Sequence, residues 1–462
     1  MIDLIDREIE AARASVSADT IKFINIDSTL GAAEAGAPFG RGVQNVLDTA
    51  IEMADKDGFF TKDYKVGVAH LALKDGQPDL GIWIHGDVVT VGDGWDFEPF
   101  NGVEFEGCVI GRGAGDNKGQ LAAMYNLLKI FKKLGIELKY NPAIFIGSNE
   151  ENGVRDILGD DSREGALGYI NVATPPKLSL VPDCGFPVGY GGKGKSVFVL
   201  RSRNKFNTFK FSAGQKATPW KAFAEFDVGT NLPETLPKCT VDGNIVWTES
   251  QSRHGSNPDP EGNMITKLSS ALLGAGLVPE ENIDVMKAFR ELTLDTEGEA
   301  LGIKIPHPIM GTPRVFIARI DFNDGYPEIE ISIRNPLSVK HDFMDKAIRE
   351  YAEKNGFDVV KSEMCIEPYM NDPDSEIVRE LCDISNKFIG SASAPYIVGG
   401  VTYAHTLPNA YPFGSSSNVA PKSFKPGRGA VHGIDESVSL DCLQRAMKIY
   451  ARALLKLNEI EW

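Results

Sequence analysis

The sequence predicts an α/β domain, built on a mostly parallel sheet with helices on both faces, that is interrupted by an inserted α+β domain. Three apolar segments, LGIWIHGD, NPAIFIGSNEENG and KLSLVPDCGFP, end as strands near His85, Asn149 and Asp183. Polar and glycine-rich residues follow each of them, as they do at the carboxyl ends of parallel strands. After about residue 190 the pattern changes to the alternation that is typical of half-exposed antiparallel strands.

The elements follow in order along the chain. Residues 1–16 are predicted to form an amphipathic helix, and residues 120–134 place Leu121, Met124, Tyr125, Leu128 and Phe131 on one helical face. KSVFVLRS, NTFKFS and EIEISIRNP are predicted strands of the insertion, and FMDKAIREYAEKNG is one of its helices. The α/β pattern resumes with SAPYIVGGVTY and closes with the helix LDCLQRAMKIYARALLKL. We therefore expect one split domain, residues 1–188 and 388–462, and an insertion at residues 189–387.

Charge and composition exclude several classes of function. The net charge of −16 argues against nucleic acid or an anionic membrane as a partner. No apolar run reaches membrane-spanning length, and the acidic start lacks the basic residues of a signal peptide, so we expect a cytoplasmic protein. The six cysteines contain no C-x-x-C pair, which argues against a structural thiolate zinc site.

Residues 189–196, GYGGKGKS, match the phosphate-binding pattern G-x-x-x-x-G-K-[ST]. A phosphate loop needs a helix that begins at its Lys-Ser pair, because the amides of the helix N-terminus help to hold the phosphate. Here Lys195 and Ser196 run into the alternating segment VFVLRSR, which predicts a strand. A nucleotide-binding ATPase is therefore a distant alternative, and a glycine hinge between two domains is the preferred interpretation.

Acids and histidines at the predicted strand ends are the stronger candidates for chemistry. His85 and Asp87 are two residues apart, so a carboxylate could hold a metal-binding imidazole in the correct tautomer. Asp116 lies in the glycine-rich loop GRGAGDNKG, where an N-cap or turn role is the plainer alternative. Glu150 and Glu151 follow an apolar strand, where two adjacent carboxylates repel each other unless a cation compensates them.

Two further segments complete the candidate set. VPDCGFP offers Asp183 at another strand end, and RGAVHGIDES offers His432 beside Glu436. Each of these residues is ambiguous alone, because structural histidines and solvated acids are common. Together, two His, two Asp and two Glu at loop positions of one sheet supply the oxygen and nitrogen ligands that a hydrolytic two-metal site requires.

These segments together resemble the di-zinc family of aminoacylases, carboxypeptidase G-type enzymes and Xaa-His dipeptidases. The motifs that carry the resemblance are HGDVVTVGDGW, GRGAGDNKG, SNEENG, PDCGFP and GGVTYA, in the family's order and spacing over most of the chain. Within the family the chain is most similar to PepV-type dipeptidases. That resemblance implies a dipeptide substrate, a cytoplasmic monomer, and a lid domain, residues 189–387, that mimics a dimer partner.

The resemblance also implies a role for each metal-site residue. Asp116 would bridge two divalent ions, zinc in first place with manganese or cobalt as alternatives. His85 and Asp183 would complete one metal site, and Glu151 and His432 the other. Asp87 would orient His85, and Glu150 would be the general base that deprotonates the attacking water.

In the insertion, the segment SRHGSNPDPEGN resembles the family's lid segment, so His254 would stabilise the oxyanion and bind substrate. Arg334 would grip the free carboxylate of the substrate. Lys216 stands where relatives carry an Asn, and His405 where they often carry an Arg, which leaves specificity open. An N-acyl amino acid deacylase of the same family is the nearest alternative, and a binding protein without catalysis is a third.

Overall fold

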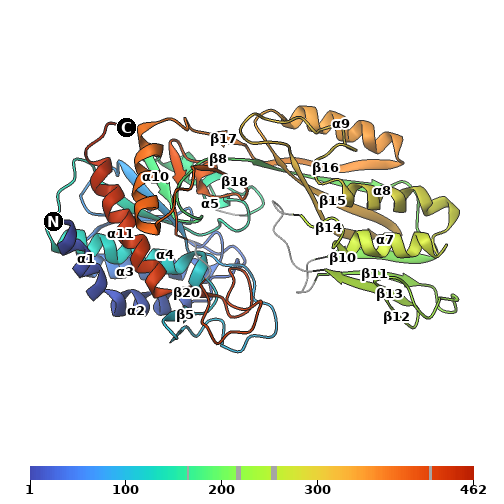
Figure 1. The fold of residues 1–462 in the computed structure, drawn as a ribbon, viewed down its shortest axis with the longest axis horizontal. Helices are drawn as coiled ribbons and strands as arrows, with labels where there is room; N and C mark the ends of the chain where they lie inside the picture. The colour runs from blue at the N-terminus through green and yellow to red at the C-terminus, as the bar shows by residue number, and fades with distance from the viewer. Residues whose placement is uncertain (164–165, 215–219, 251–257, 416–418) are drawn as a thin grey trace. The chain divides into compact units, whose positions relative to one another are not determined.

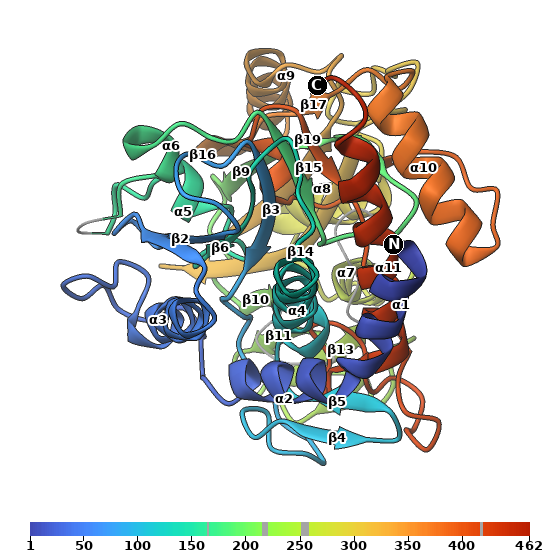
Figure 2. The same ribbon diagram turned by 90° about the vertical axis from the view of Figure 1, so that its left-hand side faces the viewer.

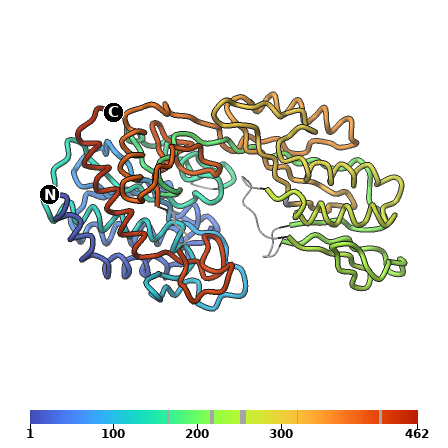
Figure 3. The backbone as a smooth tube through the Cα atoms, viewed as in Figure 1, coloured from blue at the N-terminus to red at the C-terminus, as the bar shows by residue number. Residues whose placement is uncertain are grey.

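The computed structural model describes residues 1–163, 166–214, 220–250, 258–415 and 419–462. The described chain divides into two compact units (Figures 1 and 3). Unit 1 comprises Met1–Gly191, Met370–Val398 and Thr402–Trp462, and unit 2 comprises Gly192–Tyr369 and Gly399–Val401.

Unit 1 is built on a mixed six-stranded sheet, within the described residues, in the order β1-β2-β6-β3-β7-β19. Strand β3 pairs parallel with β6 and β7, and β7 pairs parallel with β19, as the sequence predicts. The β1–β2 and β2–β6 pairs are antiparallel, so the parallel part covers four strands. The strands are β1 Phe60–Asp63, β2 Val68–Ala72, β3 Leu80–His85, β6 Pro142–Gly147, β7 Leu178–Val181 and β19 Ala410–Pro412.

Both faces of this sheet are covered. Ile82 and Ile84 of β3 belong to a core that long helices complete, and Figure 2 shows several of these helices side by side. On the other face Trp83 stacks on Phe145 at 4.3 Å between ring centroids and meets Tyr169 and Tyr403 edge-on or tilted. The helices of the first face are α1 Ile2–Ala11, α2 Arg13–Ile24, α3 Arg41–Lys56, α4 Gly119–Lys133 and α11 Leu440–Leu457; those of the second are α6 Tyr169–Val172 and η3 Tyr403–His405.

The predicted helices at residues 120–134 and 440–457 are confirmed as α4 and α11. The single helix predicted at residues 1–16 is instead two, because the chain turns at Ala12 between α1 and α2. The smaller elements of unit 1 and of its border with unit 2 are β4 Val103–Phe105, β5 Cys108–Ile110, η1 Ala114–Lys118, α5 Arg155–Leu158, β8 Gly189–Gly192, β17 Tyr369–Met370, α10 Glu376–Ile389, β18 Tyr396–Val398 and β20 Ser437–Ser439.

Unit 2 is an antiparallel eight-stranded sheet, within the described residues, in the order β12-β13-β11-β10-β14-β15-β9-β16. Helices α7 Met264–Gly274, α8 Ile283–Leu294 and α9 His341–Lys354 contribute to its core. The strands are β9 Gly194–Ser202, β10 Phe209–Gly214, β11 Trp220–Phe226, β12 Thr240–Asp242, β13 Ile245–Ser250, β14 Arg314–Asn323, β15 Tyr326–Asn335 and β16 Phe357–Ile366; η2 Glu280–Asn282 precedes α8.

The end of the insertion differs from the prediction. Residues 370–387, which we assigned to the insertion, group with unit 1. The reason is that α10 packs against α11 and places Val378, Leu381 and Cys382 in the core of unit 1. An amphipathic helix shows that it has an apolar face, but its pattern does not tell which core that face joins.

The phosphate-loop alternative is wrong, because residues 189–196 form strands. β8 ends at Gly192 and β9 begins at Gly194, and Ser196 is buried inside β9 with its hydroxyl 3.4 Å from Oδ1 of Asn335. A Cβ on Gly194 would lie 2.7 Å from the carbonyl oxygen of Ile366. This glycine therefore serves close backbone packing. In the described part of the chain, no helix is both long and apolar enough to span a membrane.

Candidate metal centre

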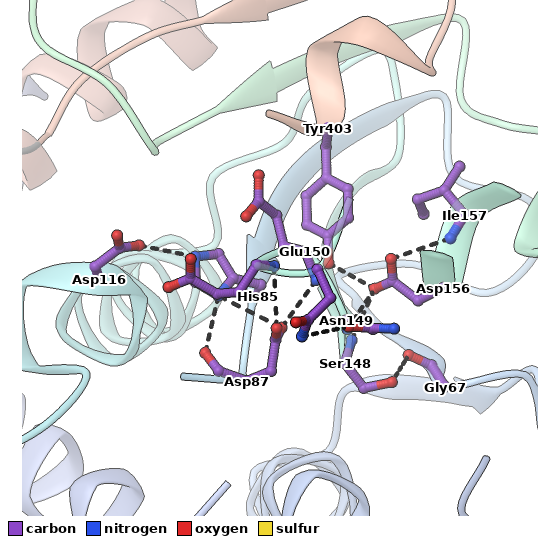
Figure 4. Close-up of polar contacts among 12 residues, drawn as sticks. Gly67, His85, Asp87, Asp116, Ser148, Asn149, Glu150, Asp156, Ile157 and Tyr403 are labelled. Carbon is purple, nitrogen blue, oxygen red and sulfur yellow. Dashed lines mark hydrogen bonds and ion pairs between the residues drawn. The ribbon is translucent and has the colours of Figure 1, made fainter. Parts of the chain in front are cut away.

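His85 and Asp116 meet at the carboxyl end of β3. His85 is the last residue of the strand and is almost fully buried. Its Nε2 atom lies 2.8 Å from Oδ1 of Asp116, and its Nδ1 atom lies 3.0 Å from the backbone oxygen of Asp87 (Figure 4). A hydrogen bond from Nδ1 fixes the tautomer in which Nε2 is unprotonated and able to bind a metal ion. The backbone of Asp87 thus takes part of the orienting role predicted for its side chain, which lies 3.5 Å from Nδ1.

The Asp87 carboxylate has a second set of partners. It accepts hydrogen bonds from the backbone amides of Glu150 and Glu151, both at 3.1 Å. These bonds tie the loop after β6 to the loop after β3. Glu150 and Glu151 are therefore held close to the imidazole of His85, as we expected for residues at neighbouring strand ends.

His432 reaches the same group of acids from the C-terminal part of the chain. Its Nε2 atom lies 3.0 Å from Oδ2 of Asp116 and 2.9 Å from Oε1 of Glu151. The backbone of His432 has a φ of 61°, in the left-handed region that a non-glycine residue adopts at a cost of about 1–3 kcal/mol. Asp116 therefore contacts two imidazoles, one through each carboxylate oxygen.

Asp183 lies in the loop after β7 and completes the cluster. One ligand atom each of His85, Glu150 and Asp183 lie within 4.8 Å of one another, and so do those of His85, Asp116 and Glu151. The structure thus brings together all of the predicted metal and base residues of unit 1. Their assignment to two separate metal positions remains a prediction.

The electrostatics of the cluster show an excess of negative charge. Burial raises the pKa of both Glu150 and Asp183 well above their ordinary values, and neighbouring carboxylates add to the effect. Burial and the charge of Asp116 also raise the pKa of Glu151. Asp116 is the exception, because hydrogen bonds from His432 and His85 outweigh burial and hold its pKa well below the usual range.

The pKa values of both imidazoles are raised as well. Burial disfavours their charged forms, but hydrogen bonds to carboxylates outweigh it in both cases. Bonds to Asp116 and Glu151 raise the pKa of His432 to about 11, and bonds to Asp116 and Asp87 raise that of His85 well above its usual value. Divalent cations would compensate the same carboxylates with the imidazoles neutral, as ligands must be.

The residues present fit a divalent metal centre. Imidazole nitrogens and carboxylate oxygens are the donors that zinc and similar ions take in hydrolytic sites. In addition, Oε1 of Glu150 is buried and has no hydrogen-bond partner among the described residues. A buried carboxylate oxygen without a partner is costly unless a cation or a water completes it.

Glu436 lies close to His432 in the sequence and was given no role there. In the structure it holds the backbone at Asp116 in place. Its Oε1 atom accepts hydrogen bonds from the backbone amides of Gly115 and Asp116, both at 3.0 Å. Its Oε2 atom accepts one from the buried guanidinium of Arg112 at 2.6 Å. Sequence reasoning gave Arg112 no role, since an arginine in a glycine-rich loop is usually solvated.

Asp156 and Tyr403 were missed altogether. Asp156 is the second residue of the short helix α5, where an acid predicts no more than an ordinary first-turn position, and it is fully buried; Figure 4 shows it beside Tyr403 and Ile157. Tyr403 donates a hydrogen bond to it at 2.6 Å across 247 positions of sequence. No local pattern could connect two residues so far apart.

The substrate residues predicted in the insertion belong to other segments of the chain than the metal-site residues. His254 and Lys216 lie outside the described residues. Arg334 is in β15 of unit 2, where burial lowers its pKa, its Nε atom has no partner among the described residues, and its Nη1 atom lies 3.5 Å from the Ser332 hydroxyl. Its role in substrate binding stays a prediction. His405 lies in η3, where its Nδ1 atom is 3.3 Å from the Thr402 backbone.

Comparison with curated proteins gives full-length relatives. The protein named "Putative dipeptidase" from Staphylococcus epidermidis is 28% identical over 451 residues, covering 92% of each chain. A protein of the same description from Staphylococcus haemolyticus is 26% identical over 479 residues, covering 97% of this chain and 98% of the relative.

Solved structures share the fold at lower identity. The di-peptidase Dug1p from Saccharomyces cerevisiae aligns with a TM-score of 0.62 at 15% identity, over 100% of this chain and 99% of its own. Human carnosine dipeptidase 1 aligns with a TM-score of 0.59 at 16% identity, over 100% of both chains. Likeness at this level supports the mixed α/β architecture and leaves function to the site.

The family model described as peptidase family M20/M25/M40 matches residues 82–456. This match begins in β3 and includes all of the clustered acids and histidines. The chain therefore belongs to peptidase family M20/M25/M40.

Proposed function

We propose that the protein is a metal-dependent dipeptidase, with Xaa-His dipeptides among its substrates. The observation that carries the proposal is the position of Asp116, which contacts His85 through one carboxylate oxygen and His432 through the other. A carboxylate between two nitrogen ligands is suited to bridge two metal ions. The relatives named as dipeptidases support the choice of a dipeptide as substrate.

Two divalent ions, zinc or alternatively manganese or cobalt, would be held by two groups that share Asp116. His85 and Asp183 would complete the first group, and Glu151 and His432 the second. The bound ions would act as Lewis acids and lower the pKa of water in the site. Asp87 keeps the donor nitrogen of His85 directed at the site through its backbone contact with Nδ1.

Glu150 is the proposed general base. Its buried Oε1 atom has no other partner among the described residues and is free to take a proton from the attacking water. Burial raises the pKa of Glu150 in the metal-free protein, and a glutamate that takes up a proton can then give it to the leaving amine. The two hydrogen bonds of Asp87 fix the backbone of Glu150 and Glu151 during this transfer.

Unit 2 is the proposed lid. In this proposal His254 stabilises the oxyanion and Arg334 binds the carboxylate of the substrate, and the enzyme is a cytoplasmic monomer whose lid takes the place of a dimer partner. Sedimentation of the purified protein at micromolar concentration tests the last point. A dimer under those conditions would contradict it.

Replacement of Glu150 by Gln tests the mechanism. The variant should keep the metal content of the wild-type protein and lose about 10²- to 10⁴-fold in kcat, the usual contribution of a general base. Glu137→Gln, at an exposed glutamate of the same unit, is the matched control and should keep wild-type activity. Full activity of Glu150→Gln, or of wild-type protein after exhaustive chelation, would overturn the mechanism.

The substrate is tested separately with a panel of β-Ala-His, other Xaa-His and ordinary dipeptides, and N-acyl amino acids. The N-acyl amino acid deacylase alternative uses the same cluster, so only the panel separates the two activities. Faster hydrolysis of the N-acyl compounds than of all dipeptides would replace the dipeptidase by the deacylase.

A further inference from the structure

Two buried carboxylates accept hydrogen bonds from four successive backbone amides in the segment that carries the acid pair. Asp156 accepts the amides of residues 148 and 149 through Oδ2, at 2.8 and 3.2 Å. Asp87 accepts the amides of residues 150 and 151 at 3.1 Å each. The segment that carries Glu150 and Glu151 is therefore held through every one of its first four amides after β6 (Figure 4).

Asp156 has no exposed surface, and all of its hydrogen bonds are internal. Besides the two amides, its Oδ2 atom accepts the Tyr403 hydroxyl at 2.6 Å, and its Oδ1 atom accepts the Ile157 amide at 3.0 Å. A buried carboxylate is stable only with such donors around it. Because Asp156 lies at the end of the loop and binds the amides at its start, it closes residues 148–156 into a ring.

The packing around Gly147 gives an independent sign that this arrangement is tight. Gly147 is the last residue of β6, directly before the four amides. A Cβ at this position would lie 1.9 Å from the Tyr403 hydroxyl oxygen and 2.1 Å from Oδ2 of Asp156. The pair therefore rests on the bare backbone of the strand, and any side chain there would push both groups away.

We propose that Asp156, held by Tyr403, is a positioning residue that fixes the Glu150–Glu151 segment for proton transfer and metal binding. The inference rests on the proposed function, in which Glu150 is the general base and Glu151 is a metal ligand. Tyr403 lies two residues after Val401, at the point where the chain returns from unit 2 to unit 1.

The reason for a catalytic consequence is geometric. Loss of the Tyr403 bond leaves Asp156 with three donors and lets its carboxylate turn, and the amides of residues 148 and 149 turn with it. A displacement of about 1 Å at a reacting group costs on the order of 10²-fold in rate. Substrate binding is not assigned to this loop, so KM should change little.

The test compares two tyrosines that each donate one buried hydrogen bond in unit 1. Tyr403→Phe removes the bond to Asp156, and Tyr140→Phe removes the bond to the Leu454 carbonyl, also 2.6 Å long, as the matched control. Tyr403→Phe should lower kcat about 10- to 100-fold, the usual effect of removing a group that holds a metal-site residue in place, with KM within about twofold of wild type. Tyr140→Phe should keep the wild-type kcat.

Zinc affinity, measured by competition with a chromophoric chelator, gives a readout that does not need a substrate. It should weaken about 10-fold in Tyr403→Phe and stay unchanged in Tyr140→Phe. If wild-type protein binds zinc but hydrolyses no dipeptide or N-acyl amino acid, the proposed function fails while this comparison still decides the inference. If both variants match wild type in kcat and zinc affinity, the positioning role is overturned.

Asp156→Asn closes a double-mutant cycle. If Tyr403 acts through Asp156, Tyr403→Phe should lower kcat clearly less in the Asp156→Asn background than alone. Equal losses in both backgrounds would mean that Tyr403 acts independently of Asp156 and would contradict the proposal. Should Asp156→Asn fail to fold, the two tyrosine variants alone decide it by the outcomes above.

Discussion

Glu436 accepts a hydrogen bond from the backbone amide of Asp116 at 3.0 Å, although the two residues lie 320 positions apart in the sequence. The same carboxylate oxygen accepts the amide of Gly115, and the other oxygen accepts the Arg112 guanidinium. Arg112 also lies 3.4 Å from the backbone oxygen of His432. Glu436 and Arg112 therefore tie the proposed bridging ligand and the backbone of the C-terminal histidine into one hydrogen-bonded network.

This network predicts a large loss of stability in Glu436→Gln. Arg112 and Glu436 have 2% and 0% side-chain exposure, so the substitution leaves a buried guanidinium without its counter-charge. Removing one partner of a buried ion pair typically costs about 3–5 kcal/mol of unfolding free energy. Urea denaturation of the metal-free protein measures this cost.

The control is an ion pair of similar length at the surface. Glu353 pairs with Arg203 at 2.6 Å and is 74% exposed, so Glu353→Gln should change the unfolding free energy by less than about 1 kcal/mol. If the two substitutions cost the same, Glu436 is not the buried anchor that its hydrogen bonds suggest.

Much of unit 1 could be predicted because its signals are local. β3 and β6 are apolar runs that end in polar residues, and α4 shows its apolar face within one segment. The acids and histidines at the strand ends meet because parallel strands deliver their carboxyl ends to one edge of a sheet. That rule needs no knowledge of which residue contacts which.

The supporting contacts could not be predicted, because they join segments that are far apart in sequence. The Asp156–Tyr403 bond and the Glu436–Asp116 bond each depend on where the C-terminal part of the chain packs. The end of the insertion was misplaced for the same reason. The amphipathic pattern of α10 does not show that its apolar face packs in the core of unit 1.

Asp156 should also leave a signature in the pH dependence of stability. Burial and the charge of Asp87 raise its pKa from 3.8 to about 6. A raised pKa in the folded state contributes stability that is fully present below pH 3.8 and is lost as the pH rises through about 6. The interval between 3.8 and about 6 corresponds to about 3 kcal/mol.

Asp156→Asn should remove this contribution, so its unfolding free energy relative to wild type should shift by about 3 kcal/mol in the variant's favour between pH 4 and pH 7. Denaturation of both metal-free proteins across that range measures the shift. A difference that stays constant with pH would show that Asp156 does not titrate with a raised pKa.

Metal binding should release protons from the imidazoles. In the metal-free protein the pKa of His432 is raised to about 11, so His432 carries a proton at pH 7 that a metal ion must displace. Calorimetric zinc titrations in two buffers of different ionisation enthalpy count the protons released. His432→Gln should release about one proton fewer than wild type, and an equal count would remove His432 from the ligands.

Arg334 provides the last prediction, on the recognition of the substrate carboxylate. Its side chain is partly buried, and its Nε atom has no partner among the described residues. A planar guanidinium is suited to bind a carboxylate through two parallel bonds. A hydrogen bond to a charged group contributes about 1.5–3 kcal/mol, so Arg334→Ala should raise KM for dipeptides about 10- to 100-fold.

The contribution of the planar guanidinium and that of the substrate's negative charge can be measured separately. Arg334→Lys keeps the positive charge but not the planar guanidinium that makes two parallel bonds. It should therefore recover only part of the affinity that Arg334→Ala loses. A dipeptide amide lacks the carboxylate, so wild type and Arg334→Ala should hydrolyse it with the same KM. Arg314, directly opposite Arg334 on β14 and already paired with Glu297 at 2.9 Å, is the matched control. If Arg314→Ala raised KM for the free dipeptide as much as Arg334→Ala, the effect would be one of general positive charge, and Arg334 would not be the specific carboxylate receptor.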